Sequence, residues 1–142
     1  MIYTQKTKMA LKLCFEAHKN QTDKSGIPYV FHPFHLAEQM KDEATTIAAL
    51  LHDVIEDTDY TMADLEKMGF PADVLEALEL LTYNDDTPYM EYVAKIKHNP
   101  IAKAVKLADL EHNSDLSRLD VVDEKALKRR EKYRQAFCLL NE

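Results

Sequence analysis

Apolar residues recur at intervals of three and four along most of the chain, and no segment alternates convincingly between apolar and polar positions. The first spacing is typical of amphipathic helices, whereas strict alternation would indicate strands. The pattern predicts a first helix from about Thr4 to Asn20. One face of that helix carries Leu11, Cys14, Phe15 and His18. The segment Ile47–Leu51 is almost wholly apolar, so we expect the helix that contains it to be buried on most sides.

Prolines and capping residues predict where the other helices begin. A first-turn proline needs no N–H partner, and Thr or Asp can cap a helix start. With only two glycines and five prolines, the chain has few residues that would interrupt long helices. The predicted elements are a helix opening at Pro33, a helix through Thr45–Val54 capped by Asp42, a short helix from Thr61 to near Gly69, a helix opening at Pro71, a helix capped by Thr87 with Pro88 in its first turn, a helix over Ile101–Leu119 opened by Pro100, and a last helix capped by Asp123 whose apolar positions are Leu127, Phe137 and Leu140.

Length, composition and charge then limit the classes of protein to which the chain can belong. The 142 residues, 46% hydrophobic and 30% charged, suit one globular all-α domain over residues 1–142. A net charge of −7 gives no electrostatic gain on a polyphosphate backbone, so we expect neither duplex DNA nor long RNA as a partner. No apolar run approaches the ~20 residues of a membrane span, and we expect a cytoplasmic protein. Cys14 and Cys138 are interpreted as two buried thiols, and the oligomeric state is left open.

The segment from Ala48 to Thr58 contains the first group of candidate functional residues. An apolar helix ends in His52 and Asp53, and Glu56 and Asp57 follow three residues later. Ionisable groups at the end of a buried helix are costly unless a partner compensates them, and a divalent cation would do so. Successive helical side chains point about 100° apart, so His52 and Asp53 can meet at one ion only where the helix ends or a side chain reaches far.

Two further segments carry residues of the same types. His32 lies directly before Pro33, which restrains its backbone. Asp109 and Asn113 are four residues apart and share a helix face. Taken singly, each could be an ordinary surface residue, and it is their combination that indicates a site.

The order of these residues resembles the HD superfamily of metal-dependent phosphohydrolases. The finer resemblance is to the hydrolase domain of the RelA/SpoT-type alarmone enzymes and their small stand-alone homologues. It covers roughly Ala17–Asp115 and rests on ordered segments, which are Ala17–Thr22, Lys24–Tyr29, Phe31–Pro33, Leu50–Thr58, Lys106–Asp109 and His112-Asn113. Several ordered matches are far less probable by chance than one. The resemblance implies an all-α, HD-type helical bundle.

The resemblance also implies roles for individual residues. The metal ligands would be His32, His52, Asp53 and Asp109. The family metal is typically Mn²⁺, although mixed imidazole and carboxylate ligation also suits Fe²⁺, Co²⁺ or Zn²⁺. Glu56 and Asp57 match the catalytic acidic pair. The residues that match substrate-binding positions are Lys24, Ser25 and Asn113. The chain has no room for the separate synthetase domain of the bifunctional relatives, so alarmone synthesis is not expected.

Three positions depart from the bifunctional enzymes, which usually have basic residues where this chain has Asp23, Leu110 and Asp115. These departures bear on the substrate. The leading hypothesis is a nucleotide phosphohydrolase, with guanosine 3′,5′-bis(diphosphate) as the first substrate to test. One alternative is an HD phosphohydrolase of another nucleotide, such as a nucleoside monophosphate. The other is a non-catalytic, metal-bound nucleotide sensor, which would not need the acidic pair.

Several residues are set aside in this interpretation. His35 is assigned to the surface or to a supporting position, and His112 to structure. Among the tyrosines, Tyr29 has the best claim to ligand contact, because of its loop. The run Lys125–Arg134 mixes basic residues with glutamates and is interpreted as a solvated helix face.

Overall fold

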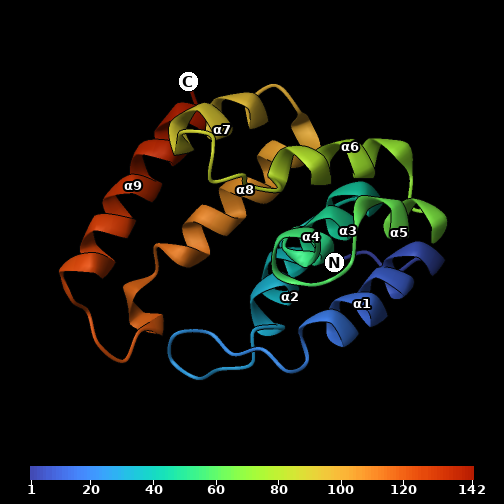
Figure 1. Cartoon of the computed structure of the whole chain (residues 1–142), viewed down its shortest axis with the longest axis horizontal. Coiled ribbons are helices and arrows are strands. Elements are labelled where there is room, and N and C mark those ends of the chain that lie inside the picture. Colours follow the sequence, from blue (N-terminus) through green and yellow to red (C-terminus); the bar gives the residue numbers. More distant parts are fainter.

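The computed structural model describes all 142 residues and confirms the predicted all-α class. Its only strand-like feature is an isolated antiparallel bridge between Thr22 and Pro28. The elements, drawn in Figure 1, are α1 (Gln5–His18), α2 (Phe31–Glu38), α3 (Glu43–Leu51), α4 (Val54–Asp57), α5 (Met62–Lys67), α6 (Ala72–Leu81), α7 (Tyr89–Ile96), α8 (Pro100–Asn113), the 3₁₀ helix η1 (Leu116–Arg118) and α9 (Glu124–Leu140).

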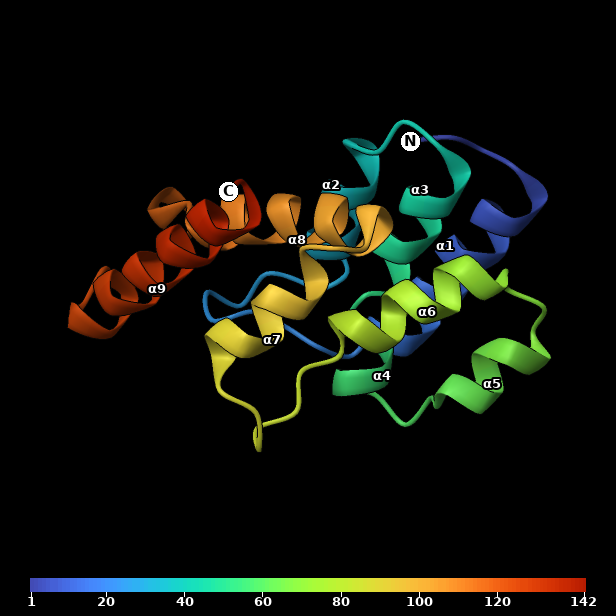
Figure 2. The same cartoon turned by 90° about the horizontal axis from the view of Figure 1, so that it is seen from above.

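Helix α3 lies at the centre of the fold. Its segment Ile47–Leu51 is completely buried, as the apolar run predicts. The helix contacts α1, α2, α6 and α8, so it is enclosed on most sides (Figures 1 and 2). Helix α9 packs instead against α7 and α8, away from α1 and α5. The long loop between α1 and α2 runs towards the connection between α8 and α9 (Figure 1).

The predicted helix starts are mostly confirmed. The side chains of Asp42, Thr61 and Asp123 each accept a backbone N–H in the first turn of the helix that follows. Three starts differ from the prediction. Pro71 and Pro88 are the residues before α6 and α7 and do not lie in the first turns of those helices. Helix α2 begins at Phe31, two residues before Pro33. Pro33 is tolerated in the first turn because backbone N–H groups there have no intrahelical acceptor, so the N–H that proline lacks is not missed.

Two predicted helices end earlier than expected. The third helix was predicted to run through Val54, but α3 ends at Leu51 and the chain leaves helical geometry at Asp53, whose φ and ψ are −108° and 2°. The helix over Ile101–Leu119 ends at Asn113. There, Asp115 accepts the N–H of Ser117 and begins η1 instead.

Some predicted core residues lie on the surface. Phe15 is 55% exposed, because α1 turns Ala10, Leu13 and Cys14 towards the core. Leu127 and Phe137 are also exposed, and α9 packs through Ala126, Ala136 and Leu140. Cys14 is a buried thiol as predicted, whereas Cys138 is exposed. None of the helices combines the length and the hydropathy that crossing a bilayer requires.

Asp42, the N-terminal cap of the central helix α3, is expected to stabilise the fold. Asp42 accepts hydrogen bonds from the amide of Thr45 at 2.8 Å and from its hydroxyl at 2.6 Å. We expect Asp42→Ala to lower the free energy of unfolding by about 1 kcal/mol, because both donors lose their acceptor. Urea unfolding measures this change. Asp59→Ala is the matched control, since Asp59 is exposed and caps no helix. Equal stability of the two variants would contradict the capping role.

Candidate metal and phosphate site

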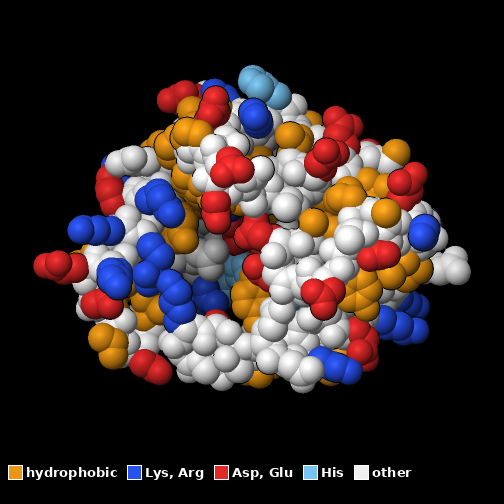
Figure 3. All heavy atoms as spheres, viewed as in Figure 1, with side chains coloured by type: hydrophobic (Ala, Val, Ile, Leu, Met, Phe, Trp, Pro, Cys, Tyr) orange, Lys and Arg blue, Asp and Glu red, His pale blue; other side chains and the backbone are white.

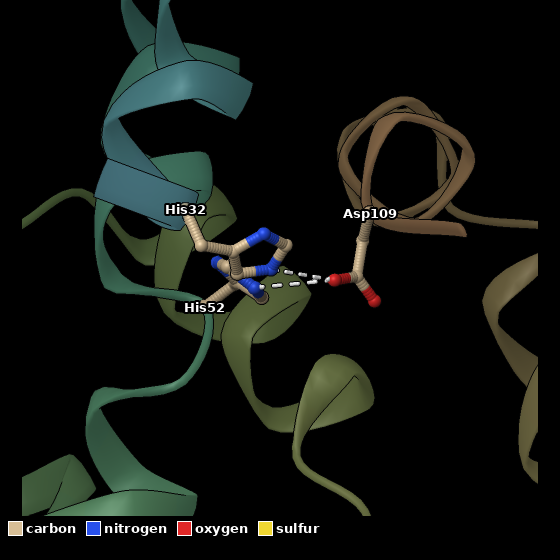
Figure 4. Close-up of side chains that lie close together, drawn as sticks. All are labelled: His32, His52 and Asp109. Carbon is tan, nitrogen blue, oxygen red and sulfur yellow. Dashed lines mark hydrogen bonds and ion pairs between the residues drawn. The ribbon is translucent and has the colours of Figure 1, made fainter. Parts of the chain in front are cut away.

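Three buried side chains from separate parts of the sequence converge on one point. His32 lies in the first turn of α2, His52 directly follows α3, and Asp109 lies in the last half of α8. Each is at most 6% exposed. The Nε2 atoms of His32 and His52 lie 2.9 and 3.6 Å from the same Asp109 Oδ1 atom, as Figure 4 shows. The three groups can therefore hold one cation between them.

The early end of α3 brings Asp53 to the same place. Because the chain leaves helical geometry at Asp53, its carboxylate turns back towards His52, and Asp53 Oδ2 lies 3.0 Å from His52 Nε2. The hydroxyl of Tyr29 donates a hydrogen bond to the same oxygen. A helix end can thus bring two adjacent residues together, as the sequence argument requires. All four residues predicted as ligands lie in one cluster.

The hydrogen bonds of His52 show which of its ring nitrogens is available to a cation. Its Nδ1 lies 2.7 Å from the carbonyl oxygen of Ala49, which can only accept, so Nδ1 carries the proton. The other ring nitrogen, Nε2, is buried, has no hydrogen bond of good geometry and faces the carboxylates of Asp53 and Asp109. Burial alone would lower the pKa of His52, but the charges of these two carboxylates raise that pKa well above its ordinary value. The site therefore favours a positive charge at Nε2, either a proton or a shared cation, and the donor set suits a divalent transition metal.

The second ring nitrogen of His32 has a partner as well. Its Nδ1 lies 2.7 Å from Nδ1 of His112, and the two rings are parallel. Burial and the charge of Arg118 lower the pKa of His112 to about 4, so its ring is neutral at pH 7. His112 also stacks on the exposed His35, with ring centroids 4.1 Å apart. His112 therefore braces His32, a role that the sequence leaves open although it favours a structural one. His35 supports the site from the surface.

Asp109 is held by two neighbours on its own helix. Lys106 donates to Asp109 Oδ2 and Asn113 donates to Oδ1, each at 2.9 Å. Burial alone would raise the pKa of Asp109, but the charge of Lys106 and the hydrogen bond from His32 hold that pKa well below its ordinary value. Asp109 therefore remains a carboxylate. Asn113 lies beside the cluster with its amide oriented by Asp109, and its contact with a ligand stays a prediction.

The acidic pair predicted as catalytic lies next to this cluster on α4. Carboxylate oxygens of Asp53, Glu56 and Asp57 can all come within 4.8 Å of one another. Glu56 Oε1 accepts the backbone N–H of Tyr83 at 2.7 Å, which fixes the orientation of its carboxylate. Burial raises the pKa of Glu56 and of Asp57, and the charge of Asp53 raises both further. A carboxylate with a raised pKa is a better base than an ordinary one.

Two cavities adjoin the cluster and share Tyr29, Asn113 and Tyr133 along their boundary. The first has a volume of about 350 Å³, and among its lining residues are Lys24, Ser25, His32, Arg118 and Arg129. The second has a volume of about 270 Å³, and among its lining residues are His52, Asp53, Glu56, Asp57, Lys106 and Lys132. Figure 3 shows a hollow in this face, with acidic side chains inside it and Lys and Arg side chains along its left rim.

Lys24 and Ser25, which match substrate-binding positions of the family, line the first cavity but differ in their hydrogen bonding. Lys24 is exposed, and burial and the charge of Arg129 lower its pKa. The Ser25 hydroxyl donates to the carbonyl of Arg118 at 3.1 Å and accepts the amide of Asp120 at 3.3 Å. Ser25 therefore ties the loop to the connection between α8 and α9.

The acids that depart from the family pattern have structural partners. Asp23 Oδ1 accepts the amides of Ser25 and Ile27, and its Oδ2 lies 3.7 Å from Arg118. Asp115 caps η1, with its Oδ1 2.5 Å from the hydroxyl of Ser117. Both carboxylates thus shape loops beside the first cavity and are partly neutralised there.

Sequence reasoning missed the residues that α9 contributes. Arg129, Lys132 and Tyr133 line the cavities, although the run Lys125–Arg134 was interpreted as a solvated face. Arg129 and Tyr133 are half-buried, because α9 packs along α8 and turns one side towards the site. Lys132 is exposed, as that interpretation predicts, but it also lines the second cavity. No local pattern separates them from the exposed residues of the same run. Only the basic excess of the segment could have pointed to an anionic ligand.

Comparison with known proteins agrees with this geometry. The chain is 40% identical over 120 residues to the guanosine-3′,5′-bis(diphosphate) 3′-pyrophosphohydrolase MESH1 of Mus musculus, which covers 73% of this chain and 66% of that protein. It is 43% identical over 79 residues to the bifunctional (p)ppGpp synthase/hydrolase SpoT of Escherichia coli (strain K12), which covers 53% of this chain and 11% of that protein. The chain thus spans just under two thirds of MESH1 and a small part of SpoT.

A solved structure and a family model extend the comparison. The structure described as "A metazoan ortholog of SpoT hydrolyzes ppGpp and plays a role in starvation responses" matches 99% of this chain and 85% of its own, with a TM-score of 0.77 and 27% sequence identity. The family model described as "HD domain" matches residues 10–106, which is more than half of the chain. Together with the cluster of His32, His52, Asp53 and Asp109, these matches show that the chain belongs to the HD-domain family.

Proposed function

We propose that this protein is a metal-dependent phosphohydrolase that removes the 3′-pyrophosphate of guanosine 3′,5′-bis(diphosphate). The observation that carries the proposal is the buried, unpaired Nε2 of His52 among two carboxylates and a second histidine, with an acidic pair at the adjoining cavity. The activities of MESH1 and SpoT support the choice of substrate. The charged cavities on either side suit a ligand with phosphates at two positions.

His32, His52, Asp53 and Asp109 would hold the metal, which we infer to be Mn²⁺ from the family resemblance. When bound, such an ion lowers the pKa of water and polarises a phosphoryl oxygen. Glu56 would accept the proton of the attacking water, with its carboxylate held by the amide of Tyr83. Asp57 would help to orient that water. Lys106 would offset charge on the phosphoryl group while it fixes Asp109.

The first cavity is the better place for the nucleoside and its 5′-diphosphate. Lys24, Arg118 and Arg129 provide three cationic side chains around it. Arg presents a planar fork of N–H donors that matches phosphate oxygens. Asn113 lies on the boundary between the cavities, where its amide can contact the ligand near the reacting phosphoryl group. Hydrolysis would then release pyrophosphate and leave the 5′-nucleotide in the first cavity.

The alternatives have less support. A nucleoside monophosphate was considered because Asp23 and Asp115 replace basic residues, but both carboxylates are engaged in loop hydrogen bonds. A non-catalytic sensor would have no use for Glu56, whose carboxylate faces the cavity that adjoins the proposed metal ligands. No specific observation favours either one.

A nucleotide panel tests the proposal. Purified, Mn²⁺-loaded protein is incubated with guanosine 3′,5′-bis(diphosphate), with nucleoside triphosphates and with nucleoside monophosphates, and the products are separated by anion exchange. We expect equal amounts of GDP and pyrophosphate from the first substrate only, and no turnover with a chelator present. An intact alarmone beside efficient cleavage of another nucleotide would reject this substrate while keeping the enzyme class.

A further inference from the structure

The wall of the second cavity opposite the acidic pair carries two lysines around one tyrosine. The ammonium nitrogens of Lys106 and Lys132 lie 5.8 and 4.6 Å from the centre of the Tyr89 ring. Lys132 also lies 5.4 Å from the centre of the Tyr133 ring. Cations within about 6 Å of an aromatic ring are attracted by its face, so the rings hold both lysines at the cavity.

These groups have unused hydrogen-bonding capacity. No carboxylate lies within ion-pair distance of Lys132, although its neighbour Glu131 pairs with Arg134. The ammonium of Lys132 is therefore held by aromatic rings alone, and its three N–H donors remain free. The hydroxyl oxygen of Tyr89 is buried and has no hydrogen-bond partner. Such a group lowers stability unless a ligand or water satisfies it.

The charge of the cavity is divided between its two sides. Asp53, Glu56 and Asp57 line the side formed by the end of α3 and by α4, whereas Lys106 and Lys132 line the side formed by α8 and α9. In Figure 3 the acidic atoms lie inside the hollow, and the basic side chains lie along its left rim. An anion in this cavity is therefore repelled by one side and attracted by the other.

The cavity is poorly suited to a nucleobase. The rings of Tyr83, Tyr89 and Tyr92 pack against one another at centroid distances of 4.9 to 5.8 Å in tilted or edge-on arrangements. Their faces are thus partly occupied by each other. On the side formed by α8 and α9, Lys106 and Lys132 supply only donors, whereas a guanine base also needs acceptors for its own N–H groups. A small, acceptor-rich anion makes better use of these groups.

We propose that Lys132 and Tyr89 bind the distal phosphate of the substrate's 3′-pyrophosphate, which makes the second cavity a pyrophosphate subsite. The inference rests on the proposed function for the identity of the substrate. Lys132 donates to the terminal phosphate oxygens, and the Tyr89 hydroxyl supplies a further donor from the buried wall. Lys106 remains paired with Asp109 at the inner end of the subsite. These contacts select a 3′-pyrophosphate over a 3′-monophosphate, which has no distal phosphate.

Binding measurements test the subsite without relying on turnover. Inorganic pyrophosphate and GDP are titrated separately, by calorimetry, into the metal-loaded wild type and into Lys132→Met, Lys132→Arg and Tyr89→Phe. We expect Lys132→Met to weaken pyrophosphate binding roughly tenfold, as for loss of one charge-assisted contact, with GDP binding unchanged. Tyr89→Phe should weaken pyrophosphate binding less, and Lys132→Arg should restore it because the cation is kept.

A control variant is available on the same helix, α9. Lys128→Met removes an exposed cation one turn away that lines neither cavity, and it should leave both affinities unchanged. Equal weakening of GDP and pyrophosphate by Lys132→Met would overturn the subsite, as would unchanged pyrophosphate binding or a wild type that binds none. If the wild type binds pyrophosphate through Lys132 but leaves the alarmone intact, the proposed function fails and the subsite stands.

Discussion

Glu56→Gln is expected to reduce turnover by roughly 10²–10⁴-fold, the usual contribution of a positioned general base. Gln keeps the size of the side chain and still offers an oxygen to the amide of Tyr83. The substitution therefore removes the base without reorienting the side chain. Metal content and nucleotide affinity should remain near the wild-type values. Metal analysis and steady-state hydrolysis on one preparation measure both effects.

The pH profile gives a second readout of the same residue. Because burial raises the pKa of Glu56, its carboxylate is protonated as the pH falls through a value above the ordinary ~4.3. Wild-type turnover should therefore fall on the acidic side in that range, and the residual turnover of Glu56→Gln should lack this step. Unchanged turnover in Glu56→Gln would transfer the role to Asp57. Loss of metal would instead identify Glu56 as a ligand.

Asp53→Ala is expected to remove most of the bound metal and with it nearly all activity. The change deletes an anionic ligand from a buried cluster and also deprives the Tyr29 hydroxyl of its acceptor. Because a ligand that binds only the folded state stabilises it, the metal-dependent rise in melting temperature should disappear as well. Metal analysis after gel filtration and thermal unfolding with and without Mn²⁺ measure these effects.

A nearby carboxylate provides the control for that experiment. Asp59 lies in the loop after α4, is exposed, and belongs to neither group of candidate ligands. Asp59→Ala should keep full metal content and the full thermal shift. If Asp53→Ala also keeps its metal, Asp53 is not a ligand and the site is formed by His32, His52 and Asp109 alone.

Local signals in the sequence predicted the fold, and the family resemblance indicated the four candidate ligands that the structure brings together. The apolar run Ile47–Leu51 predicted the buried central helix, and Asp42 and Asp123 marked helix starts that the structure confirms. The adjacent His52 and Asp53 could meet at one ion only where the helix ends or where a side chain reaches far. The structure contains that end, although it lies earlier than the apolar pattern indicated.

What the sequence could not predict depends on contacts between distant segments. The approach of α9 to the site decides which residues of Lys125–Arg134 line the cavities, and helical periodicity alone does not record it. The same holds for His112, whose role depends on the 2.7 Å contact with His32 eighty positions earlier. Likewise, the neutralisation of Asp23 by Arg118 requires two loops to meet.

Locating the metal directly is the measurement that tests the account most closely. Crystals of the protein grown with Mn²⁺ would be measured with X-rays near the manganese absorption edge, so that anomalous scattering marks the ion. We predict one strong peak in contact with the Nε2 atoms of His32 and His52 and with carboxylate oxygens of Asp53 and Asp109. A peak held by Glu56 and Asp57 without either histidine, or no peak between the two histidines, would contradict the account.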